Sequence, residues 1–150
     1  MKNIIQNIQN QIKDIANLRY VDEDWGQLDY YSPNFPVQWP CVLIDINDVN
    51  YSNIGRDKTK TPVNRQMADV VCTLKVANLR LTNTSAKAPQ NQKDNVWSIF
   101  NLLEEVHKKL QGFNPSAESG SLIRIRQSRQ FREDGVQVYL VSYRFSQNNI

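Results

Sequence analysis

The chain has 150 residues, of which 40% are hydrophobic and 22% charged, and its formal net charge is +3. This length suits one domain with a sizeable core, and the composition is ordinary for a globular chain. The net charge is too small to indicate nucleic-acid binding by itself, and no run of about 18 apolar residues predicts a membrane span. We therefore expect a single domain over residues 1–150 that has no membrane partner.

The N-terminus does not have the pattern of a secretory signal. It carries one lysine but neither a continuous apolar stretch nor a small-residue cleavage site. Cys41 and Cys72 both lie in predicted strands and can form at most one disulfide. Without an export signal, a reduced, cytosolic pair of thiols is expected.

Two segments have the hydrophobic periodicity of amphipathic helices. The first extends from Asn3 to about Leu18 and carries isoleucines at helical spacing. The second has Asp94 as its predicted N-cap and Gly112 as the glycine that follows its last turn. Its apolar stripe consists of Val96, Ile99, Phe100, Leu103, Val106 and Leu110.

Two strands are predicted between these helices, from Cys41 to about Tyr51 and from Met67 to Leu81. The polar segment 53–66 is expected to be a long loop. In the second strand the alternation shifts after Ala77, which predicts a β-bulge near Asn78. The aromatic segment 19–38 is expected to be a loop that covers a sheet edge or lies in an interface.

A predicted β-hairpin from Leu122 to Phe145 is the most informative stretch, and its turn lies at Glu133-Asp134-Gly135. In the first arm, strand alternation places Arg124, Arg126 and Arg132 on one face and Arg129 on the other. These arginines either form a solvated edge that discourages stray pairing or contact phosphates or acidic residues of a neighbour.

The second arm of this hairpin is apolar on both faces. Val136, Val138 and Leu140 point to one side, whereas the other side carries Tyr139, Val141, Tyr143 and Phe145. Such a strand is central in its sheet or is covered from outside the domain.

The predicted element order is α-β-β-α-β-β. We expect an α+β fold in which two amphipathic helices pack on one face of a four-stranded, mainly antiparallel sheet. Two helices can cover only one face, so the remaining apolar face predicts oligomerisation. The residues predicted to line an oligomer interface or a channel are Arg124, Arg126, Arg129, Arg132, Tyr139, Val141, Tyr143 and Phe145.

No catalytic, cofactor-binding or metal-binding constellation is predicted. His107 has no second histidine or paired cysteine at ligand spacing, so it is expected to be a helix-surface residue. The carboxylates at Glu104-Glu105 and Glu133-Asp134 do not form a buried acid-base pair. Phosphate-loop, dinucleotide and nucleophile-elbow motifs are absent from the sequence, and we do not expect an enzyme.

The order of these segments resembles the tail-terminator proteins (minor tail or tail-completion proteins) of long-tailed bacteriophages and related prophages. The resemblance covers nearly the whole chain. After the N-terminal helix it follows WPCVLIDINDV, ADVVCTLKVANLRL, NVWSIFNLLEEVHKKLQGF and DGVQVYLVSYRF.

This resemblance implies a small α+β subunit that forms a ring, typically a hexamer, on the head-proximal end of the tail tube. Such a ring would bind the tail-tube protein and a head-completion or connector protein, and DNA would pass through its channel without sequence-specific binding. It implies a location in the virion, and in the host cytoplasm during assembly. A head-tail connector (adaptor or stopper), a tail-tube subunit and a DNA-binding accessory protein are the alternatives.

Overall fold

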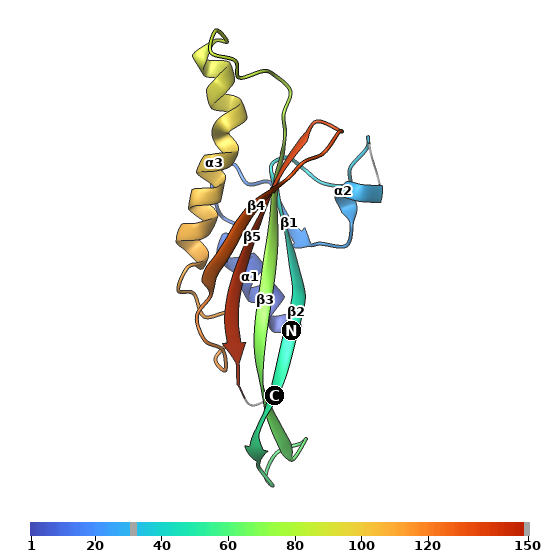
Figure 1. Cartoon of the computed structure of the whole chain (residues 1–150), viewed down its shortest axis with the longest axis vertical. Coiled ribbons are helices and arrows are strands. Elements are labelled where there is room, and N and C mark those ends of the chain that lie inside the picture. Colours follow the sequence, from blue (N-terminus) through green and yellow to red (C-terminus); the bar gives the residue numbers. More distant parts are fainter. Residues whose placement is uncertain (31–32, 149–150) are drawn as a thin grey trace.

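One sheet with helices on both faces makes up the structure, a computed structural model that describes residues 1–30 and 33–148. The molecule is elongated, and the strands run along its long axis (Figure 1). In chain order the elements are α1 (Lys2–Ile12), β1 (Tyr20–Glu23), α2 (Gln27–Tyr30), β2 (Cys41–Arg56), β3 (Asn64–Leu79), α3 (Gln90–Leu110), β4 (Ile123–Gln130) and β5 (Val136–Gln147).

The sheet has five strands in the order β1-β2-β3-β5-β4, so the prediction of a four-stranded sheet was wrong. The additional strand is β1, which pairs in parallel with the start of β2, whereas every other neighbouring pair is antiparallel. The sheet is therefore mixed, and α2 is a third helix within the segment predicted as a loop. Both missed elements have only 4 residues, too few to show a hydrophobic period.

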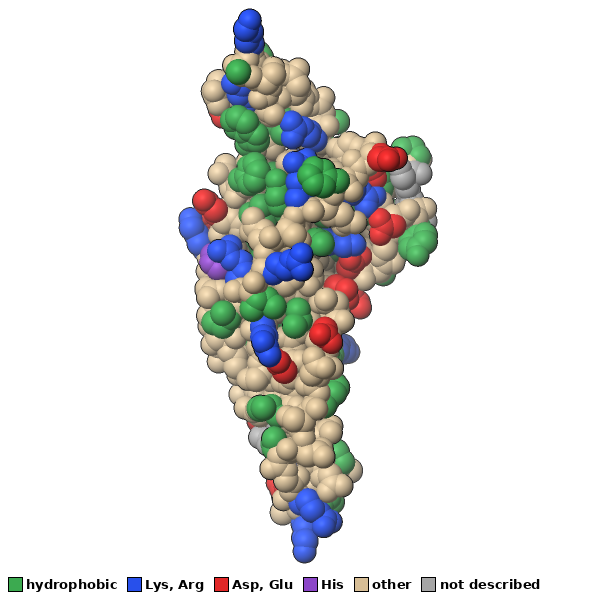
Figure 2. Space-filling model, viewed as in Figure 1, with side chains coloured by type: hydrophobic (Ala, Val, Ile, Leu, Met, Phe, Trp, Pro, Cys, Tyr) green, Lys and Arg blue, Asp and Glu red, His purple; other side chains and the backbone are tan. Residues whose placement is uncertain are grey.

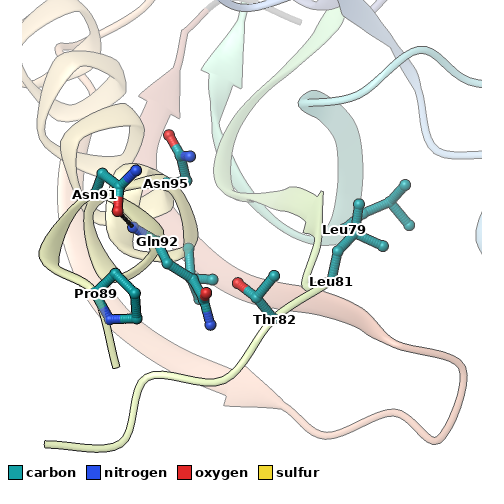
Figure 3. A pocket seen from close by; sticks show the side chains of 8 residues that line it. Leu79, Leu81, Thr82, Pro89, Asn91, Gln92 and Asn95 are labelled. Atoms are coloured by element: carbon teal, nitrogen blue, oxygen red, sulfur yellow. Dashed lines mark hydrogen bonds between the residues drawn. The ribbon is translucent and has the colours of Figure 1, made fainter. Parts of the chain in front are cut away.

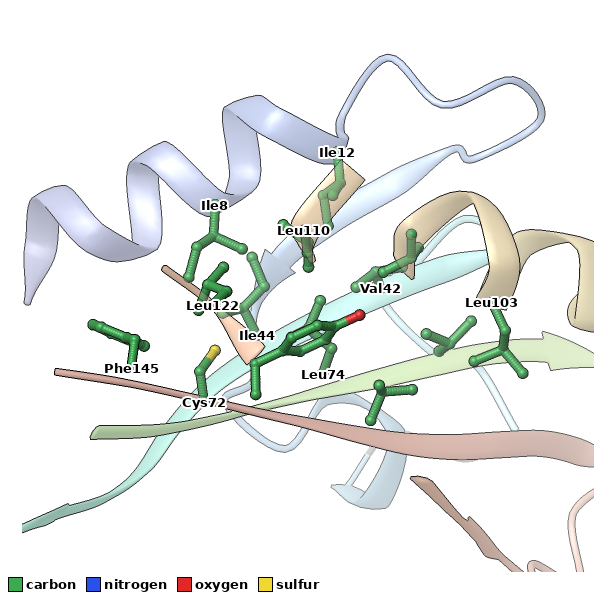
Figure 4. Packing of buried hydrophobic residues seen from close by; sticks show 14 of the residues in the cluster. Ile8, Ile12, Val42, Ile44, Cys72, Leu74, Leu103, Leu110, Leu122 and Phe145 are labelled. Carbon is green, nitrogen blue, oxygen red and sulfur yellow. The ribbon is translucent and has the colours of Figure 1, made fainter. Parts of the chain in front are cut away.

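The main core lies between the sheet and the two long helices. α1 and α3 cover the same face, here called the helix face, as the sequence predicts. Isoleucines of α1 and the apolar stripe of α3 meet side chains of β2, β3 and β5 (Figure 4). Each fully buried aliphatic side chain of this kind stabilises the fold by roughly 1.5 to 3 kcal/mol. This burial holds α1, because isoleucine is only a moderate helix former.

The opposite face of the sheet is covered in part by α2 and the segment after it. Leu28 of α2 packs with Val136 and Val138, and Phe35 and Trp39 lie against the same cluster. The Phe35 and Trp39 rings meet edge to face, with 5.6 Å between their centroids. The aromatic segment therefore covers a face of the sheet within the chain, and both sides of β5 are buried without a second subunit over this part.

The ends of several elements differ from the sequence prediction. α1 stops at Ile12, although Ile15 in the following turn still packs into the core. Asp94 lies inside α3, which begins after Pro89. The predicted bulge near Asn78 was wrong, because β3 pairs with β5 in unbroken register to Leu79. The alternation changes there because Ala77 is buried and Leu79 half-buried on the opposite face, in the cluster that contains Leu28.

Half of the predicted loop 53–66 is strand. β2 continues to Arg56 and β3 starts at Asn64, so only residues 57–63 form the turn. β5 pairs with β3 only from Ala68 onward, and the remaining two-stranded arm projects at one end of the long axis (Figure 1).

Candidate subunit interface at the edges of the sheet

β4 forms one edge of the sheet. It pairs with β5 alone, and within the described part of the chain no other strand pairs with its outer side. Ile123 and Ile125 on this strand are 48% and 51% exposed. Arg124, Arg126 and Arg129 are also exposed, and none of the three has an ion-pair partner among the described residues. This outer side of β4, with its three arginines, is called the basic edge below.

A β-bulge changes which way these arginines point. The register between β4 and β5 shifts between Arg124 and Arg126, so Ile125 is an extra residue in β4. Arg124 and Arg129 lie opposite Tyr143 and Tyr139 on the helix face, whereas Arg126 lies opposite Ser142 on the other face. The prediction that Arg124 and Arg126 share a face was therefore wrong, because one inserted residue reverses strand alternation.

Arg132, the fourth predicted arginine, is not on this edge and instead joins α2 to the hairpin loop. Its Nη1 donates to Asp29 Oδ1 at 2.7 Å, and its Nη2 donates to Asp134 Oδ2 at 2.6 Å and also to the Leu28 carbonyl oxygen. Hydrogen bonding to Asp134 raises the pKa of Arg132, and the same contact lowers the pKa of Asp134. Only 11% of the Arg132 side chain is exposed. It is a structural clamp between two segments of the same chain.

Three of the apolar residues predicted for an interface are core residues. Val141, Tyr143 and Phe145 are 2%, 0% and 3% exposed beneath α1 and α3, which leaves them no surface for a second subunit. Tyr139 is half-buried and packs against Phe100, with 5.4 Å between the ring centroids.

His107 and Tyr143 form a polar contact at the margin of this core. His107 Nδ1 lies 3.2 Å from the Tyr143 hydroxyl oxygen. Burial raises the pKa of Tyr143 to about 12, whereas burial and the charge of Arg124 lower the pKa of His107. The histidine predicted to lie on the helix surface is therefore half-buried and holds a tyrosine in place.

The other edge of the sheet is acidic. β1 ends at Glu23, opposite Ile44, and from Asp45 onward the outer side of β2 pairs with no other described strand. Glu23, Asp45 and Asp48 are exposed, and none of them is in an ion pair among the described residues. This outer side of β1 and β2 is called the acidic edge below. Sequence analysis missed it because β1 was not predicted and the acids of β2 have the pattern of a solvated strand face.

Asp45 has an unfavourable environment for its charge. Asp45 is exposed overall, but partial burial of its carboxyl group raises the pKa, the nearby Asp24 raises it further, and Lys75 lowers it. The Lys75 ammonium group, however, is already bound to Asp24, with 3.0 Å between Nζ and Oδ2. Asp45 therefore shares the charge of Lys75 with Asp24 and forms no ion pair among the described residues.

A single row of side chains crosses the sheet from the basic edge to the acidic edge. Arg126 lies opposite Ser142, Ser142 opposite Thr73, and Thr73 opposite Asp45. The hydroxyl oxygens of Ser142 and Thr73 are 2.9 Å apart, which is hydrogen-bonding distance. Arg126 and Asp45 thus stand at the same height along the strands, at opposite ends of one row.

A concave surface lies between the start of α3 and the C-terminal end of β3 (Figure 3). Its volume is about 450 Å³, and its lining combines apolar side chains with amides and contains no titratable group. The residues are Leu79, Leu81, Thr82, Pro89, Asn91, Gln92, Asn95 and Val96. The lining therefore offers shape and hydrogen bonds rather than acid-base chemistry.

The described residues, 1–30 and 33–148, contain neither a cluster of metal-binding side chains nor a helix able to span a membrane. No three His, Cys, Asp or Glu side chains of these residues are placed to hold a metal ion. None of the described helices has the length and apolar character needed to cross a membrane.

Similarity to known proteins is found only among solved structures. No family model matches the chain, and no curated protein matches it. A chain in the virion of a native gene transfer agent particle is similar with a TM-score of 0.44 and 9% sequence identity, over 97% of this chain and 92% of that one. The function of the present chain is therefore inferred from its own geometry.

Proposed function

We propose that this chain is a structural virion subunit that assembles side by side into a closed ring. The observation that carries this proposal is the pair of open sheet edges, one basic and one acidic, on opposite sides of the same sheet. Contacts between two different surfaces of identical subunits are heterologous, and they give a ring when the rotation between subunits closes. A hexamer is the ring size that the sequence resemblance implies.

The ends of the subunit favour a single ring over a tube of stacked rings. Basic side chains gather at both ends of the long axis, over the tip between β2 and β3 and over the loop that leads into α3 (Figure 2). Arg56, Lys58 and Lys60 lie in the first region, and Lys87 and Lys93 in the second. Stacking one ring on another would bring like charges together, which costs free energy. This supports a tail terminator rather than a self-polymerising tail-tube subunit.

As a tail terminator, the ring would sit at the head-proximal end of the tail, where it binds the tail-tube protein and ends tube growth. Its other end would offer the docking surface for a head-completion or connector protein, and DNA would pass through its channel. Assembly in the host cytoplasm would precede incorporation into the virion. A head-tail connector, either adaptor or stopper, is the second candidate, because it would also be a single ring.

Native mass spectrometry and electron microscopy of the purified chain test this proposal. We expect one closed oligomer of defined subunit number, seen as single-layer rings, that binds the ends of tail tubes. Binding only to a portal or connector ring would favour the second candidate. A chain that stays monomeric with and without tail tubes, or that grows into long tubes by itself, would overturn the tail-terminator proposal.

A further inference from the structure

We propose that Arg126 on the basic edge of one copy forms an ion pair with Asp45 on the acidic edge of the next copy. The proposal rests on the ring described above and identifies the contact that builds it. The partner is a second copy of this chain, because each subunit presents both members of the pair on opposite sides of one sheet. The acidic edge of one copy therefore offers a negative charge to the unpaired arginine on the basic edge of its neighbour.

The heights of the two residues agree with the symmetry of a ring. Cyclic symmetry relates neighbours by a rotation without any rise along the axis. When the axis runs along the strands, side chains that meet between neighbours must lie at the same height in each subunit. Arg126 and Asp45 fulfil this condition, because they end the same row across Ser142 and Thr73.

The strand directions agree with the same arrangement. Three successive antiparallel pairings separate β2 from β4, so these two strands run in opposite directions within one subunit. Side-by-side copies related by rotation about an axis along the strands therefore place β4 of one copy antiparallel to β2 of the next. β1 ends opposite Ile44, and the Asp24 N–H still donates to the Ile44 carbonyl oxygen at 2.8 Å, so among the described residues the backbone pairing on this side of β2 stops just before Asp45.

The surroundings of each residue favour a partner from outside the subunit. Among the described residues Asp45 forms no ion pair, and the nearby Lys75 is bound to Asp24. Arg126 is exposed, and the half-exposed Ile123 and Ile125 lie beside it on β4. When a neighbour covers these isoleucines, water is removed around the guanidinium group, and an ion pair there is stronger than on an open surface.

The contact is expected to run through side chains rather than through a continuous backbone ladder. The bulge at Ile125 interrupts the regular edge of β4, and the Arg124 backbone N–H already donates to Gln111 Oε1 at 2.9 Å. A bulge and charged side chains discourage unselective strand pairing. A partner that carries the opposite charge at the matching height can still bind this edge. A second copy of the chain is such a partner, so the contact is selective for it.

Charge reversal tests the pair in the full chain. Arg126→Glu and Asp45→Lys are each expected to weaken ring assembly by about tenfold or more in the dissociation constant, since attraction is replaced by repulsion. The double variant, which carries both changes, is expected to recover most of the loss. An equimolar mixture of the two single variants is expected to assemble as well, because each supplies the edge that complements the other.

Lys109→Glu on the exposed side of α3 is the matched control, since it reverses a charge on the helix layer rather than on either edge of the sheet or at either end of the molecule. Sedimentation velocity measures assembly, and circular dichroism confirms that every variant is folded. Single variants that assemble like the wild type, or a double variant and mixture that recover nothing, would overturn the Arg126–Asp45 pair while leaving the ring proposal intact. A wild-type chain that is monomeric under all conditions would overturn both.

Discussion

Arg132 allows a sharp test of how the fold is held together at one end of the sheet. Its guanidinium group binds Asp29, Asp134 and the Leu28 carbonyl, and these contacts tie α2 to the hairpin loop between β4 and β5. A well-buried hydrogen bond to a charged group contributes roughly 1.5 to 3 kcal/mol. Because the Asp29 side chain is 47% exposed, the contacts with Asp134 and the Leu28 carbonyl are expected to dominate.

We therefore expect Arg132→Ala to lower the free energy of unfolding by about 2 kcal/mol, which corresponds to about 4 to 8 °C in Tm for a chain of this size. Urea denaturation of the wild type, of this variant and of Lys58→Ala as the surface control measures the difference. Arg132→Lys should recover only part of the loss, because an ammonium group cannot reproduce the planar fork. An Arg132→Ala variant as stable as the wild type would refute the clamp.

The same clamp predicts a pH dependence. The contact with Arg132 lowers the pKa of Asp134 in the folded chain, so its contribution to stability is present above the unfolded pKa of the group. It is lost as the pH falls through the folded pKa. The difference in stability between the wild type and Arg132→Ala should thus be constant near neutral pH and shrink below about pH 4. A difference that grows on acidification would contradict this assignment.

Two further predictions concern the core between the sheet and the helices. Ile8→Ala in α1 should cost about 2 to 5 kcal/mol in thermal or urea unfolding, because Ile8 is fully buried and its removal leaves a cavity; a loss below about 1 kcal/mol would mean that α1 is only loosely packed. Burial raises the pKa of both Cys41 and Cys72 to about 12, so a thiol reagent at pH 8 should label neither cysteine until denaturant is added. Rapid labelling of the native chain would contradict their placement in the core.

The long elements could be predicted from the sequence because each shows its own period over many residues. α1, α3 and the β4–β5 hairpin all follow from hydrophobic spacing, and α1 and α3 lie on the same face as expected. β1 and α2 could not be predicted in this way. They are short, and tertiary contacts hold them. β1 is held by pairing with β2, and α2 is held by the packing of Leu28 against Val136 and Val138 and by Arg132.

The candidate site was only partly predictable, since its geometry depends on single-residue details. The arginines of β4 were recognised, but one extra residue at Ile125 separates Arg124 from Arg126, and no propensity rule marks a bulge at an isoleucine. The apolar excess of β5 was interpreted as a contact between subunits, whereas α2 and the aromatic segment cover it within the chain. The acidic edge can be recognised only once the strand order is known, because β1 covers just the start of β2 and leaves the rest of its outer side at the edge of the sheet.

The oligomeric state of the wild-type chain in solution tests the ring most directly. Native mass spectrometry at low and at high ionic strength would measure it, since contacts between opposite charges weaken with salt. The proposed function predicts one closed oligomer of fixed subunit number at low salt and smaller species as the salt concentration rises. A monomer at every salt concentration, with and without tail tubes, or an open series of oligomers without a preferred size, would contradict it.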